Sequence, residues 1–538
     1  MSTRTGRRSP TATPWLAVAV AVASLVPLGY LFLSGTSWRD IATELAYRST
    51  VDAIGQTLAL TVLVTLVAGG LGLAAAVVVT RTTVPAPRLM TVLFALPLAV
   101  PGFVSAYATY SAELVYAPRS SVVTSLVGAA VVLSLSLYPY VFLPCVIALR
   151  GVDPALEEAA TSLRPGRFSA FRVVSVPALR PALAAGALIV GLHVLAEYGA
   201  MAQLGRSTLT TKIVGEMLDY GNYRSARSLS LLLVGLSVLV LVGTRWLAGR
   251  SVVGEVTRGV ARPPGRHALR GWRWPILGVS VLVPLLAVGP TVLMTARGLL
   301  STHRAEAPAW SVVGSALTSS VGYAATAAIV ATVCALPVSW WVTRHPTTLS
   351  HLTERAVWLA HAVPSAILAL ALVYLATRAV PALYKTSTVL IAGYVILYLP
   401  LAVANQRVGL QSARRTFDEV ASSLGSRPSR TFARITLPLA APGFAAGAIL
   451  VALDASKELT TTLMLLPFNT STLSSKLWAT TNGESLDFTA AAPYAGLLVL
   501  LGVVPVYLLV HNTLSSSTAA GPVALVDGAP TQPAEVRL

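Results

Sequence analysis

The sequence predicts an all-α membrane protein with about twelve transmembrane helices, arranged as two parallel six-helix repeats. Three observations lead to this prediction. The chain is 55% hydrophobic and only 11% charged, whereas soluble domains carry about 25% charged residues. Its apolar residues form runs of about 20 residues, and each run is long enough to cross a bilayer as a helix. A polar segment between two of these runs recurs in the second half of the chain.

The apolar runs define the expected membrane spans. In chain order they cover residues 15–34, 56–80, 89–112, 121–149, 182–204, 228–249, 274–298, 313–343, 352–378, 386–408, 442–466 and 490–513. The first run is too long for the apolar part of a secretory signal, so we interpret it as a retained helix. Six helices return each half to its starting side, and both halves therefore share one orientation.

The formal net charge of +18 could indicate a nucleic-acid-binding protein, but the placement of the cations argues against it. Arginines gather in the N-terminus, in the two recurring polar segments and in the stretch 250–273, whereas most other connections are poorer in cations. The segment 205–227 is an exception. This asymmetry is the positive-inside bias of a multi-span protein. It predicts that the N-terminus and both recurring segments are cytoplasmic, and that the partner is the lipid bilayer rather than nucleic acid.

The recurring segment runs from a glutamate to a proline nineteen residues later, from Glu158 to Pro177 and from Glu419 to Pro438. The copies lie 261 positions apart. The repeat suggests two equivalent docking points for a two-fold partner. We divide the chain into a cytoplasmic N-terminus (1–14), a first repeat (15–249) with its loop at 150–180, a basic cytoplasmic linker (250–273), a second repeat (274–513) with its loop at 411–440, and a disordered cytoplasmic tail (514–538).

Small residues follow the glutamate in both copies and would let another surface approach closely. They are Ala159 and Ala160 in the first copy and Ala421 in the second. Gly425 can end a helix at low steric cost. A generic amphipathic connector is the alternative interpretation, and two copies at equal spacing argue against it.

Ionisable and polar residues inside two predicted spans are candidates for a translocation path or gate, because such groups are costly in a membrane and are functional by default. They are His193, Glu197 and Tyr198 in the first half, and Asp454, Lys457, Glu458 and Thr460 in the second. We expect His193 with Glu197, and Asp454 with Glu458, to lie four residues apart on one helix face. The alternatives are a buried structural pair between Asp454 and Lys457, or groups that reach the outer surface.

No metal ligands are assigned. The two cysteines lie in separate predicted spans, and the seven histidines show no metal-ligand spacing. His361, close to Pro364, is interpreted as a helix-packing residue.

The recurring segment resembles the cytoplasmic coupling loop of permeases of binding-protein-dependent ABC importers, whose pattern is Glu-Ala-Ala, three residues, Gly, nine residues and Ile-x-Leu-Pro. The second copy matches at Glu419, Ala421, Gly425 and Pro438, whereas the first has Arg164 in place of the glycine. The resemblance implies the type I importer fold and a bacterial inner (cytoplasmic) membrane location. It also implies two copies of an ABC ATPase subunit that contact the glutamates and small residues, and an extracytoplasmic solute-binding protein.

The ATPase is not expected within this chain. A Walker A loop needs a glycine before its lysine, and no lysine here follows a glycine. We therefore expect a transport subunit that binds no cofactor itself and is not an enzyme, with ATP used by the partner.

The segment 457–478 resembles the fused permeases of ferric-iron importers, which usually have proline where this chain has Thr460. Ferric iron favours oxygen ligands, so carboxylates suit it. Related permeases serve thiamine, sulfate, polyamines or phosphonates, and these cargos remain alternatives. An ion-coupled secondary transporter is an alternative of a different class, because it would also use two repeats and membrane carboxylates.

Overall fold

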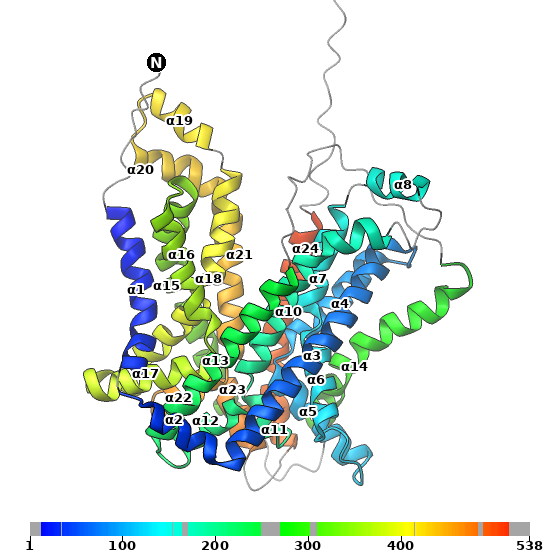
Figure 1. Ribbon diagram of the computed structural model, residues 1–538, viewed down its shortest axis with the longest axis vertical. Coiled ribbons are helices and arrows are strands. Elements are labelled where there is room, and N and C mark those ends of the chain that lie inside the picture. The colour runs from blue at the N-terminus through cyan, green and yellow to red at the C-terminus, as the bar shows by residue number, and fades with distance from the viewer. Residues whose placement is uncertain are drawn as a thin grey trace, which may run out of the picture.

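A computed structural model describes residues 12–33, 35–152, 154–163, 171–248, 269–301, 309–413, 415–482 and 488–515 (Figure 1). Within these ranges the regular structure is helical and no β-strand occurs, so the predicted fold class is confirmed. The first half contains α1 (Ala12–Leu33), α2 (Trp38–Ala46), α3 (Arg48–Arg81), α4 (Pro87–Ala95), η1 (Leu96–Ala99), α5 (Gly102–Tyr116), α6 (Leu126–Leu137), α7 (Pro139–Arg150), α8 (Pro154–Leu163), η2 (Phe171–Ser175), α10 (Val176–Ala196), α11 (Gly199–Gln203), α12 (Leu209–Leu218) and α13 (Tyr223–Ala248).

The second half repeats this order. It contains η3 (Arg270–Trp272), α14 (Arg273–Leu300), α15 (Trp310–Arg344), α16 (Thr348–Ala362), α17 (Ser365–Ala379), η4 (Pro381–Leu383), α18 (Ser387–Ser412), α19 (Arg415–Ser423), α20 (Pro428–Thr431), η5 (Phe432–Thr436), α21 (Leu437–Lys457), α22 (Thr460–Leu465), α23 (Leu473–Thr481) and α24 (Phe488–Ser515). The short helices α8, α11 and α12 thus have counterparts in α19, α22 and α23.

The described residues include nine helices long and apolar enough to cross a membrane, and twelve spans result when three bent helix pairs are each counted once. Each predicted run falls on one of these twelve. Three of the runs are bent: α4 and α5 meet at 91°, α16 and α17 at 98°, and α6 and α7 at 44°. Proline causes the two sharpest breaks. Pro101 and Pro364 force the preceding valines into extended backbone, which ends the helix.

The first helix of each half contacts the other half. The N-terminal helix α1 lies against α15, α16 and α17, whereas α14 lies against α4, α5 and α6 and also against α24 of its own half. Figure 1 shows α1, in blue, beside the yellow-green helices of the second half, and α14, in green, beside the blue and cyan helices of the first. The main hydrophobic core accordingly joins residues of α1 to residues of α15, α16, α17 and α18. The two halves share their cores.

Figure 1 places α8 and α19 at one end of the molecule, and α2, α11, α12 and α23 toward the opposite end. At that opposite end Arg224 of α13 donates to Asp40 of α2 at 2.6 Å. The backbone N–H of Ser37 and then the Arg224 guanidinium lower the pKa of the Asp40 carboxyl. This exposed ion pair links α2 to α13.

Candidate functional site

The two short helices α8 and α19 carry equivalent exposed residues. Glu158 and Glu419 are both exposed. Two residues before each glutamate stands a large apolar side chain, Leu156 (58% exposed) or Phe417 (45% exposed). Each helix therefore presents one acid and one apolar residue at the same end of the molecule.

Gly425 ends α19, as expected from its lack of a side chain. It adopts a φ of +79°, and the next amide, Ser426 N, donates to Ala421 O at 3.0 Å, which satisfies a carbonyl of the last turn. Ala421 itself is only 6% exposed. This alanine therefore packs largely against its own chain. Ala159 is exposed and Ala160 is half-buried, whereas Arg164 lies outside the described residues.

Both loops return to the membrane through a π turn, η2 or η5, followed by Pro177 or Pro438 in the first turn of the next long helix. A proline has no N–H to bond the carbonyl four residues earlier. That carbonyl lies within the π turn in each half, and such wide turns commonly occur next to functional sites. The equal Glu-to-Pro spacing in the sequence thus reflects equal local geometry.

A cavity of about 850 Å³ lies between the two halves. Its lining includes all seven residues predicted for the path, namely His193, Glu197, Tyr198, Asp454, Lys457, Glu458 and Thr460. The rest of the lining is largely apolar and comes from helices of both repeats, including the broken pairs α4–α5 and α16–α17. The sequence predicted that residues 261 positions apart contribute to one path, and the structure places them around one cavity.

Glu197 and Glu458 lie just past the ends of α10 and α21, in extended backbone. Each therefore stands at the end of its helix, and it lines the same cavity as the residue four positions earlier, His193 or Asp454. Each carboxylate accepts an N–H from the next short helix, Ala200 N at 2.9 Å for Glu197 and Thr461 N at 3.0 Å for Glu458. The carboxylates thus cap α11 and α22, because the first amides of a helix have no partner within it.

Several other polar groups of the cavity have partners within the chain. Lys457 contacts Asp454 at 2.8 Å, as the structural alternative anticipated, and the pair still lines the cavity. Tyr398 donates to Glu458 Oε2 at 3.0 Å. The His193 ring lies 4.6 Å from that of Tyr140. His361 also lines the cavity, and its Nδ1 contacts the carbonyl of Leu397.

The two halves meet directly at the end of the cavity that lies away from α8 and α19. Gln203 of α11 donates to Thr481 of α23 at 2.6 Å. The rings of Tyr198 and Trp478 are 5.2 Å apart. A Cβ on Gly199 would approach Leu459 Cδ2 to 2.6 Å, so the contact needs a glycine. We refer to these residues as the outer contact.

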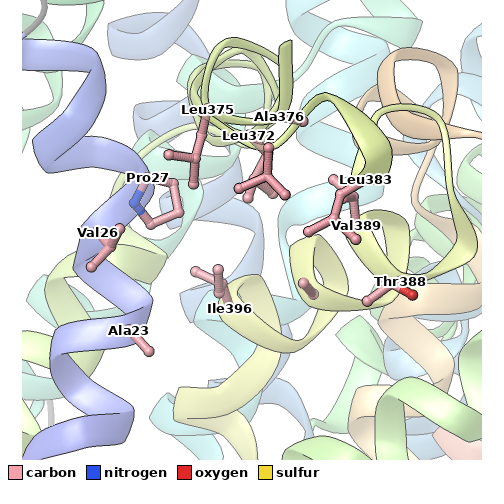
Figure 2. A pocket seen from close by; sticks show the side chains of 12 residues that line it. Ala23, Val26, Pro27, Leu372, Leu375, Ala376, Leu383, Thr388, Val389 and Ile396 are labelled. Carbon is pink, nitrogen blue, oxygen red and sulfur yellow. The ribbon is translucent and has the colours of Figure 1, made fainter. Parts of the chain in front are cut away.

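No group of three or more His, Cys, Asp and Glu residues within the described ranges is close enough to hold a metal ion. A second pocket, between α1, α17 and α18, is lined by Ala23, Leu372, Ile396 and other apolar side chains (Figure 2). It has few polar groups to bind a hydrophilic cargo. The central cavity is therefore the better candidate for a path.

Several residues of the site carried no sequence signal that we used. Tyr140, Tyr398 and Trp358 line the cavity, but an aromatic residue in an apolar run cannot be told from a core residue. Arg355 also lines the cavity, and its charge inside the predicted span 352–378 could have revealed it. Glu157 and Asp418, which precede the loop glutamates, hold α8 and α19 in place through ion pairs. Their equal offset could have revealed them.

The comparisons with known proteins agree with this geometry. Residues 68–253 and 326–515 each match the family described as "Binding-protein-dependent transport system inner membrane component". A Fe(3+)-transport system permease protein of Haemophilus influenzae is 32% identical over 94% of this chain and 98% of its own length. A ferric transport system permease protein of Actinobacillus pleuropneumoniae is 26% identical over 59% of this chain and 48% of its own. A sulfate transport system permease protein of Salmonella typhimurium is 29% identical over 44% of this chain and 92% of its own. The chain is a multi-pass transport subunit rather than an enzyme, and it belongs to the permeases of binding-protein-dependent ABC importers.

Proposed function

We propose that this chain is the permease of a ferric-iron importer in a bacterial inner membrane. Two copies of an ABC ATPase would dock on α8 and α19, and a solute-binding protein would deliver cargo at the opposite end. The main support is the similarity to a Fe(3+)-transport permease along nearly the whole of both chains. The acidic residues of the cavity add a chemical argument, because ferric iron prefers oxygen ligands.

The path would bind its cargo weakly. Glu197, Asp454 and Glu458 line the cavity from two helices, and each already has a hydrogen-bond or ion-pair partner in the chain. A cation, free or chelated, would meet carboxylates that are only partly available to coordinate it. It would not find a complete set of ligands that could hold it tightly. Weak sites suit transport, since cargo must leave as readily as it enters.

The outer contact would separate the cavity from the binding protein. Cargo entry then requires α11 to move away from Leu459 and α23. ATP binding and hydrolysis by the partner subunits would supply the energy, delivered at α8 and α19. The chain itself would need no cofactor.

Permeation of an oxyanion is the second candidate. Lys457 and Arg355 also line the cavity, and a sulfate permease is among the similar proteins. The test is uptake by proteoliposomes that contain this chain, its ATPase and its binding protein. We expect ATP-dependent uptake of radiolabelled ferric iron and none of sulfate, molybdate or thiamine. Uptake of one of these instead, without iron, would reassign the cargo and leave the family unchanged.

A further inference from the structure

In each half, a buried arginine holds the docking helix, α8 or α19, against the transmembrane helices. The proposed function gives these two arginines no role. In the first half, Arg81 at the end of α3 donates to Glu157 of α8 at 2.8 Å. Ser175, at the end of the π turn η2, also donates to Glu157. Arg81 further donates to the carbonyl of Leu149 at the end of α7, at 3.4 Å. We call these residues the first clamp.

The second half has the same arrangement. Arg344 at the end of α15 contacts Asp418 of α19 at 3.1 Å. Thr436, at the end of η5, donates to Asp418 at 2.8 Å. Arg344 also donates to the carbonyl of Ala413, which follows α18, at 2.8 Å. These residues form the second clamp. Each clamp thus joins four segments, namely the long helix, the helix before the loop, the docking helix and the π turn.

Burial makes these contacts costly to break. The two arginines are 2% and 7% exposed, and Ser175 and Thr436 are almost fully buried. Salt screens buried charges much less than exposed ones, and a buried charge left without its partner destabilises a structure strongly. The acid of each clamp precedes the exposed glutamate directly. In each half, one acid therefore faces the bundle and the next one faces solvent.

We infer that the two clamps are positioning sites that transmit movement of the docking helices into the bundle. A push on α8 would move Glu157 and, through Arg81 and Ser175, the ends of α3 and α10. A push on α19 would act on α15 and α21 in the same way. Because α10 and α21 carry Glu197 and Glu458 at their far ends, the same helices reach the cavity. This inference rests on the proposed docking of ATPase subunits at α8 and α19.

The clamps are not identical. Arg344 also lies over the Trp340 ring at 5.3 Å, and that ring packs edge-on against Phe432 of η5. The repeat places Val77 where the second half has Trp340. The second clamp is therefore held by an aromatic pair that the first lacks. We expect its loss to have the larger effect.

The test separates transport from ATP hydrolysis. The whole complex, with the chain, its ATPase and its binding protein, is reconstituted with Glu157→Gln, Asp418→Asn or both. These changes keep size and remove charge. We expect the ATPase to remain bound and to hydrolyse ATP, while cargo transported per ATP falls at least fivefold in the double variant. Unchanged transport per ATP in that variant would overturn the inference.

Two further sets of variants guard against simple misfolding. Ser175→Ala and Thr436→Val remove the hydroxyl and leave the ion pair intact, and we expect a smaller loss of transport per ATP. Ser175→Thr and Thr436→Ser give each clamp the hydroxyl residue of the other, and these variants should transport normally. A purely structural role would instead lower the amount of protein in the membrane at constant transport per ATP, which would also overturn the inference.

A failure of the docking proposal can be distinguished from a failure of this inference. Glu158→Ala with Glu419→Ala should release the ATPase, whereas the clamp variants should retain it. Loss of ATPase binding in the clamp variants would place Glu157 and Asp418 in the docking surface and contradict their role as positioning residues. Retention of the ATPase by the Glu158 and Glu419 variant would contradict the docking proposal alone.

Discussion

Glu197 and Glu458 each combine two functions in one carboxylate. One oxygen accepts the amide that begins the next short helix, and the side chain also lines the cavity between the halves. A Glu→Gln change at either position keeps an oxygen that can accept the same amide and removes the negative charge. These residues therefore allow charge and helix capping to be separated.

For the cavity carboxylates, we expect Glu197→Gln and Glu458→Gln to lower cargo uptake several-fold while the permease still assembles with its ATPase. The Ala variants should in addition lose about 0.5–2 kcal/mol of stability, because a cap is lost. Uptake and thermal unfolding of the purified complex measure the two effects. Asp219→Asn, which removes an exposed carboxylate after α12, is the control and should transport normally. Normal uptake by both Gln variants would exclude these acids from the path.

For the docking glutamates, a hydrogen bond to a charged group is worth about 1.5–3 kcal/mol. Each Ala variant should therefore weaken ATPase binding roughly tenfold to a hundredfold. We expect Glu419→Ala to be the more damaging change, because Phe417 on its helix and Leu424 just after it are exposed, and Arg164 replaces the family glycine in the other loop. Co-purification with the ATPase measures binding, and Ser423→Ala on the same helix is the control. Equal binding by Glu419→Ala and the control would contradict the role of Glu419.

At the scale of elements, the breaks in the helices matter more than their lengths. The apolar runs predicted where the chain crosses the membrane, because hydrophobic length depends on composition alone. They could not predict where a span bends. Pro101 and Pro364 end their helices, yet Pro400 lies inside the continuous helix α18. The same residue type gives both outcomes, because neighbouring helices decide whether the freed carbonyl finds another partner.

The short helix α11 offers a test of the outer contact. A Cβ at Gly199 would overlap Leu459 and Phe103, and overpacking of this kind costs about 1–3 kcal/mol. We expect Gly199→Ala to push α11 away from the second half, to raise ATP hydrolysis without binding protein, and to reduce uptake. Gly235→Ala, at a helical glycine with open space around it, should behave like the unmodified chain. Identical ATPase rates in the two variants would rule out α11 as part of a gate.

At the scale of the whole molecule, the candidate site could be predicted from the repeat. The packing of the first helices on the opposite halves could not be predicted. His193 and Glu197 could be aligned with Asp454 and Glu458 because sequence offsets survive in the fold. The packing of α1 on α15, α16 and α17 leaves no such trace. One apolar helix surface resembles another, so composition cannot show which half a helix will join.

The orientation of the molecule is open to direct measurement. Ser429 on α20 and Thr470 after α22 are exposed and belong to opposite ends of the second repeat. A cysteine at Ser429 should react with an impermeant thiol reagent only in inside-out vesicles, and one at Thr470 only in intact cells. Cys145 and Cys334 would first be replaced by alanine. Labelling of Ser429→Cys in intact cells would invert the topology and place the docking helices outside.

The position of α1 has a consequence for how this chain is made. The helix leaves the ribosome well before the helices on which it packs, which begin only at Trp310. At about 5–20 residues per second, synthesis of the intervening segment takes roughly 15–60 s. Throughout that time α1 sits in the bilayer with lipid where its protein neighbours will later be. The buried hydroxyl of Ser24 donates a hydrogen bond to Val20 O of the same helix at 2.9 Å. This hydroxyl therefore has a partner before the second half is present. Once the second half has been synthesised, its helices replace lipid around α1, and the two halves complete their packing together.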